Sequence, residues 1–159
     1  MRIVHRRRLL LLCGVASALL TAVPAMAAVD AYMTIDGIKG ESSSGSIHLV
    51  SVTHDAATGM AAGRRMHGTI TIVKEIDKAS PKLFSASTSH QTLGNVTINF
   101  EGASGGAKTA QKIVLTNAVI LSVRKAGGNS EQITFDYQNI EVTYAKGGKT
   151  ATDDWEAPN

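Results

Sequence analysis

The chain has 159 residues, with 16 lysines and arginines against 13 acidic residues. This length allows no more than one ordinary domain. Four of the basic residues lie within the first 27 positions, which hold no acidic residue, so residues 28–159 carry twelve basic against thirteen acidic residues, a formal charge of −1. A domain without a basic excess is a poor partner for nucleic acid, and we expect no nucleic-acid binding.

The first 27 residues have the order of a secretory signal peptide. A basic start that includes Arg6–Arg8 precedes an apolar stretch from Leu9 to Leu20, and Ala25-Met26-Ala27 provides small residues for cleavage. The apolar stretch is shorter than the roughly 20 residues of a membrane-spanning helix. We therefore expect cleavage after Ala27, export to the periplasm or the medium, and no membrane association of the mature chain.

The mature domain, residues 28–159, is expected to depend on a hydrophobic core alone. Cys13 is the only cysteine and lies in the signal segment, so no disulfide can form after cleavage. A domain of this length buries enough apolar surface to fold without one.

Alternating apolar and polar residues predict strands in the first half of the domain. One strand ends at Gly37–Gly40, and Ser46–Thr53 has the β-branched composition of a second. The small, glycine-containing residues 54–65 predict an exposed loop, after which the alternation resumes. The residues expected to face inward here are Ala31, Met33, Ile35, Gly68, Ile70 and Ile72.

A single short helix is expected after these strands. Ser80 is a suitable N-cap, and Pro81 suits the first helical position. Leu83, Phe84 and Ala86 would form its apolar side. A helix of two or three turns is unstable alone in water, so it should cover a hydrophobic opening of the sheets.

Three longer strands are expected in the second half. The run from Ala110 to Lys125 has apolar residues at odd positions, with a bend or bulge expected at Asn117, and the final strand should contain a β-bulge near Gln138-Asn139. Bent strands of this length predict an all-β fold, a small antiparallel β-barrel of two packed sheets with one short α-helix. The expected inward residues are Val96, Ile98, Phe100, Ile113, Leu115, Val119, Leu121, Val123, Ile133, Phe135, Tyr137, Ile140, Val142 and Tyr144.

The residue types of common active sites do not form a recognisable pattern. The four histidines of the mature chain are expected at solvent-facing positions, and Glu101–Gly106 lacks the lysine and hydroxyl residue that end a phosphate loop. Asp153 and Asp154 are expected in a solvated acidic tail. We expect no catalytic residue, cofactor or metal site, and therefore no enzyme. The histidines are His48, His54, His67 and His90.

Four blocks of sequence are similar to one known family. They are AVDAYMTIDGIKGES (28–42), IVKEIDKASPKLFSAS (72–87), GNVTINFEGAS (94–104) and the run 112–144. Together they resemble the Hcp (haemolysin-coregulated protein) family of type VI secretion. The most specific block contains Asp77–Leu83, which is similar to the strand-into-helix junction of that family.

This resemblance implies a ring-forming structural protein. Members of the family assemble into hexameric rings that stack into a hollow tube, so the expected partners are further copies of the chain and spike, sheath or effector proteins. Family subunits enter the machine from the cytoplasm, whereas this chain carries an export signal. The loop 54–65, which carries ring-to-ring contacts in the family, is rich in alanine and glycine here. The alternative is therefore a periplasmic or secreted β-barrel binding module that has adapted the fold.

Three residues are candidate subunit contacts. Lys125 and Glu131 are expected on edge strands, where charge reversal would weaken assembly more than folding. Trp155 is a lone tryptophan in a polar tail. Its ring is expected either to pack on the barrel or to reach a neighbouring subunit.

Overall fold

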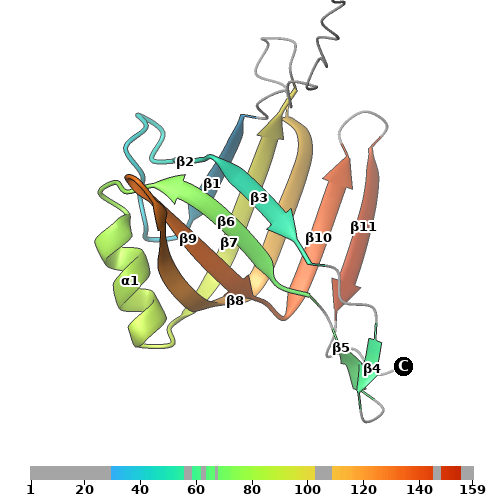
Figure 1. Cartoon of the computed structure of the whole chain (residues 1–159). Helices are drawn as coiled ribbons and strands as arrows, with labels where there is room; N and C mark the ends of the chain where they lie inside the picture. Colours follow the sequence, from blue (N-terminus) through green and yellow to red (C-terminus); the bar gives the residue numbers. More distant parts are fainter. Residues whose placement is uncertain are drawn as a thin grey trace, which may run out of the picture.

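The computed structural model describes residues 30–55, 59–61, 64–66, 68–102, 109–144 and 148–154 (Figure 1). The expected signal peptide and Trp155 lie outside the described residues. Within them, no helix is long and apolar enough to cross a membrane. The elements are β1 (Ala31–Ile35), β2 (Ile47–Leu49), β3 (Ser51–His54), β4 (Gly59–Ala61), β5 (Arg64–Met66), β6 (Ile70–Glu75), α1 (Ser80–Thr88), β7 (Thr92–Glu101), β8 (Thr109–Gly127), β9 (Ser130–Asp136), β10 (Asn139–Tyr144) and β11 (Lys149–Asp154).

The main sheet is antiparallel at every pairing. Its strand order is β2-β1-β7-β8-β9-β6-β3, and β10 pairs with both β8 and β11. Figure 1 shows β3, β6 and β9 crossing in front of β1 and β7, with α1 at one flank and the β10–β11 hairpin at the other. The expected all-β class with one short helix is confirmed, whereas closure of the sheet into a barrel stays a prediction.

The long strand β8 connects two parts of the sheet, because it pairs with β10 in its first half and with β9 in its second half. Residues 111–116 pair with β10, whereas residues 119–127 pair with β9. Asn117 lies at the change, with a φ of 52° that reverses the alternation of its neighbours. The Asn117 side-chain amide donates a hydrogen bond of 2.6 Å to the side-chain oxygen of Gln138, which holds the start of β10 at this point.

The inward parity expected for β8 is therefore wrong between Asn117 and Leu121, whereas Val123, beyond the bulge, packs against the core as expected. Ala118 and Ile120 are buried, and Leu121 is 55% exposed at a bulge between Ile120 and Ser122. The run 130–144 likewise forms two strands rather than one bulged strand, because β9 ends before Tyr137, and β10 pairs with another part of β8 and with β11 instead of β6.

The first half of the domain follows the predicted alternation in β1 and β6. The stretch predicted as one strand is divided at Val50 into β2 and β3, which pair with β1 and β6 respectively. The prediction of a loop at residues 54–65 is wrong in part. His54 ends β3, and β4 and β5 form a separate two-stranded hairpin.

Helix α1 covers the sheet with two side chains only. Leu83 and Ala86 are buried, whereas Phe84 is 58% exposed, so its expected inward position is wrong. Ser80 is the first helical residue rather than the N-cap, which is Ala79 and makes no side-chain capping bond. The hydroxyl of Ser80 is used elsewhere, as described below.

The hydrophobic core lies between the crossing strands and beneath α1. It is aliphatic with two buried aromatic side chains, and Val52, Phe100, Val123 and Val142 pack against it at partly buried positions. The core residues are Ala31, Met33, Ile35, Ile38, Ile47, Leu49, Ile70, Ile72, Ala79, Leu83, Ala86, Leu93, Val96, Ile98, Ile113, Leu115, Ala118, Ile120, Ile133, Phe135, Tyr137 and Ile140.

Candidate functional site

Strand β6 brings a lysine into the apolar interior. Lys74 has the same parity as Ile70 and Ile72, and its side chain is 0% exposed. A buried ammonium group is costly unless hydrogen-bond acceptors and opposite charges surround it. The neighbouring strand supplies one such charge, because Glu131 is the cross-strand partner of Lys74 and is also buried.

Four acceptors surround the Lys74 ammonium group. Nζ donates to Glu131 Oε1 at 2.9 Å and to Asp77 Oδ1 at 2.7 Å. It also lies 3.1 Å from Ser80 Oγ and 2.6 Å from the backbone oxygen of Glu75. The acceptors come from β6, β9, the residues between β6 and α1, and the first residue of α1, so one side chain joins these elements.

The acceptors also bind one another. The Ser80 hydroxyl donates to Glu131 Oε1 at 2.7 Å and accepts from the backbone N–H of Asp77 at 3.0 Å. Asp77 Oδ1 accepts from the backbone N–H of Ala79 at 3.0 Å. No buried side-chain nitrogen or oxygen among the described residues lacks a hydrogen bond. The β6–α1 junction is thus a fully connected polar network, which fixes the geometry of the groups it joins.

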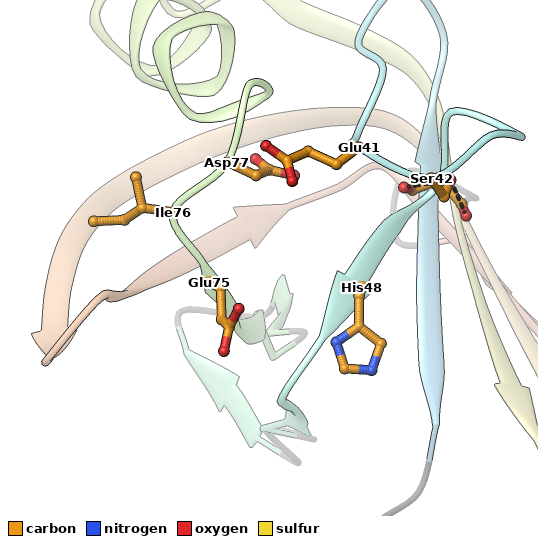
Figure 2. Close-up of a pocket in the computed structure, with 7 residues that line it drawn as sticks. Glu41, Ser42, His48, Glu75, Ile76 and Asp77 are labelled. Carbon is orange, nitrogen blue, oxygen red and sulfur yellow. Dashed lines mark hydrogen bonds between the residues drawn. The ribbon is translucent and has the colours of Figure 1, made fainter.

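A polar pocket of about 130 Å³ lies beside this junction (Figure 2). Figure 2 shows the Glu41 side chain pointing toward Asp77, whereas Ile76 points away on the opposite side of the chain. Ser42 Oγ lies 2.9 Å from Ser46 Oγ. The pocket is lined by Glu41, Ser42, Ser46, His48, Glu75, Ile76 and Asp77.

The pocket offers carboxylates, hydroxyls and one imidazole. Asp77 Oδ1 is already engaged by Lys74, and His48 Nε2 lies 3.9 Å from Asp30 Oδ1. Within the ranges that the structure describes, no group of three or more histidine, cysteine or acidic side chains is placed to hold a metal ion. The expectation that the chain has no cofactor and no catalytic residue stays a prediction.

A second polar contact lies at the end of β3, where the chain leaves the sheet toward β4. His54 Nε2 lies 3.0 Å from the hydroxyl of Tyr137, whose side chain is buried after β9. Burial, together with the carboxylates of Asp153 and Asp136, raises the pKa of Tyr137 from 10.0 to about 12. The phenol therefore stays protonated at neutral pH, and its hydroxyl holds the His54 side chain at the end of β3.

The remaining histidines differ in environment. His48 is exposed and lies edge-on to Tyr32, with ring centroids 5.3 Å apart. His90 is exposed after α1 with a positive φ of 50°. His48, His54 and His90 thus lie on β2, at the end of β3 and after α1, respectively, and His67 lies outside the described residues.

The placement of Lys125 and Glu131 on edge strands is wrong. Strand β9 lies between β8 and β6, and Lys125 and Glu131 are cross-strand partners on adjacent interior strands. Lys125 is exposed near the β8–β9 turn, so its role as a subunit contact stays a prediction. Glu131 is occupied within the subunit by Lys74 and Ser80. Charge reversal there would leave Lys74 facing a like charge and would impair folding.

Sequence reasoning missed Lys74, although the pattern contained it. Lys74 continues the inward parity of Ile70 and Ile72, and Glu131 precedes Ile133 and Phe135 with the same parity. Two opposite charges at inward positions of different strands indicate a buried pair when those strands are neighbours, and only the strand order shows that they are.

Comparison with known proteins extends over most of the described fold. The family model described as "Type VI secretion system effector, Hcp" matches residues 32–144, from β1 to the end of β10. The chain belongs to the Hcp family. A relative from Pseudomonas aeruginosa, named "Major exported protein", is 32% identical over 124 residues, which cover 70% of this chain and 72% of that protein.

Solved structures of Hcp proteins share the fold. Hcp1 from Salmonella typhimurium has a TM-score of 0.72 at 22% identity and covers 83% of this chain and 99% of its own. A type VI secretion system effector from Yersinia pestis has a TM-score of 0.68 at 26% identity, covering 79% of this chain and 99% of its own. The Hcp fold therefore accounts for the strand order described above.

We expect Lys74→Met to lower the free energy of unfolding by about 3–5 kcal/mol, because it leaves a buried carboxylate without its cation. Lys78→Met is the matched control, since Lys78 is exposed, and should change stability by no more than about 0.5 kcal/mol. Urea denaturation of the segment 28–159 measures both. Equal effects of the two substitutions would contradict the buried network.

The raised pKa of Tyr137 predicts a loss of stability at alkaline pH. Because folding raises this pKa, the associated stability is complete below about pH 10 and is lost as the pH rises toward about 12. Absorbance titration of tyrosinate, followed together with circular dichroism, measures it. Tyr137→Phe should remove the ionisation near pH 12, and a titration curve identical to that of the wild type would refute the assignment.

Proposed function

We propose that this chain is a ring-forming, structural subunit of type VI secretion that is exported through its own amino-terminal signal and performs no catalysis. The observation that carries the proposal is the family match, which includes all strands from β1 to β10 and the β6–α1 junction. The same match does not favour the alternative of a binding module that reuses the fold.

The architecture suits a subunit that assembles side by side with its copies. A ring needs two different, complementary surfaces on each subunit, and neither surface requires a reactive group. Among the described strands, β3 pairs only with β6 and β11 only with β10, which leaves an edge on each for further contacts. The Lys74 network joins β6, the partner of the β3 edge, to β9 and α1.

Export is the second part of the proposal. The first 27 residues have the composition of a secretory signal, and the Pseudomonas aeruginosa relative carries the name of an exported protein. We propose that cleavage after Ala27 releases the domain 28–159 into the periplasm or the medium. There it would form a hexameric ring and meet spike, sheath or effector proteins. Lys125 and Trp155 remain candidate contacts in that ring.

One preparation tests both parts. The full chain is produced in a host with secretory export, and the exported protein is purified. Its intact mass should correspond to a chain that begins at Ala28, and light scattering after size exclusion should give the mass of a hexamer. A strict monomer at high protein concentration would overturn the ring, and an uncleaved, cytoplasmic chain would overturn export.

A further inference from the structure

Helix α1 presents an apolar side chain to solvent on the flank where it lies. Phe84 is 58% exposed although Leu83 beside it is fully buried. Lys78 and Lys82 are also exposed near the start of the helix, and residues 80–88 contain no acidic side chain. The outer surface of α1 therefore combines one large aromatic ring with positive charge.

The β10–β11 hairpin has an uncovered apolar face. Burial decreases along one face of β10, from Ile140 at 6% exposure through the partly buried Val142 to Tyr144 at 51%. Ala151 of β11 pairs with Val142 and is exposed. Figure 1 shows this hairpin extending past β3, β6 and β9. The core-facing side of the sheet thus continues beyond the strands that cover it.

The two surfaces lie on opposite flanks of the molecule (Figure 1). Two different patches on opposite flanks are the arrangement that a head-to-tail contact requires, and repetition of such a contact closes a ring. We propose that α1 of one copy packs, through Phe84, on the face formed by Val142, Tyr144 and Ala151 of the next copy. This inference rests on the proposed ring-forming function and specifies which surfaces of neighbouring subunits meet in the ring.

Charge and helix direction agree with this pairing. Asp153 pairs with Ile140 at one end of the hairpin face, and Lys149 pairs with Tyr144 at the other. If α1 lies along β11 with its amino-terminal end toward Asp153, then Lys78 and Lys82 face Asp153 and the carboxyl end of the helix faces Lys149. Each charge then meets the helix end or side chain of opposite sign. Contact of Phe84 with Tyr144 adds an aromatic pair.

Matched substitutions test the contact in the mature chain. Phe84→Asp and Ala151→Glu should each raise the concentration needed for half-assembly at least about tenfold, as expected for central interface residues. Ser85→Asp and Thr150→Glu are the controls, because both are exposed and Thr150 lies on the opposite face of β11. Light scattering across a dilution series measures assembly, and melting temperatures should match the wild type.

Cysteine pairing gives an independent test, since the mature chain has no cysteine. The double variant F84C/A151C should form disulfide-linked oligomers on oxidation, whereas F84C/T150C should not. A hexamer that is insensitive to Phe84→Asp, or equal cross-linking of the two pairs, overturns this contact and leaves the ring intact. A monomeric wild-type chain overturns the contact together with the ring.

Discussion

The ammonium group of Lys74, buried between two strands and the start of a helix, determines how the helix joins the sheet. Removing it from water is costly, and four oxygen acceptors at 2.6–3.1 Å compensate that cost. Because these acceptors come from separate elements, they must all be in place at once. Ser80 begins the helix yet uses its hydroxyl to bind Glu131 of β9 instead of capping its own helix. The network therefore specifies one position of α1 on the sheet, which a purely apolar contact through Leu83 and Ala86 would specify less strictly.

The position of α1 has consequences at both flanks of the molecule. With Leu83 and Ala86 directed into the core, Phe84 is directed outward on one side. On the other side, β8 changes partner at Asn117, so β10 and β11 extend the sheet away from the strands that cover the core. Two polar residues, the buried Lys74 and the left-handed Asn117, thus position the two surfaces that the proposed ring requires. These surfaces are the outer side of α1 and the β10–β11 hairpin. A signal peptide at the amino terminus would deliver this subunit by a route different from direct loading in the cytoplasm.

Alternation alone predicted the strands whose two faces differ clearly. It gave the inward side chains of β1 and β6, because apolar residues at every second position have one stable arrangement. It indicated an irregularity at Asn117 but not that the inward parity reverses there, because a single left-handed residue shifts the parity without changing the composition of the strand. It also joined segments that are separate strands: β2 pairs with β1 whereas β3 pairs with β6, and β9 and β10 pair with different parts of β8. The Lys74 pair depends on which strands are neighbours, and that information is absent from local pattern. The similarity of Asp77–Leu83 to the strand-into-helix junction of the family indicated this region. It did not identify Lys74 as the central side chain of the network.

Amide hydrogen exchange on the segment 28–159 and on its Glu131→Gln variant is the sharpest test of whether the network fixes the helix. Glutamine keeps the shape of the side chain but removes the charge that faces Lys74. We predict that amides of α1 exchange at least about tenfold faster in the variant, while those of β7 and the first half of β8 change little, because the helix alone loses its attachment. Uniform acceleration throughout the domain, or unchanged exchange in α1, would contradict it.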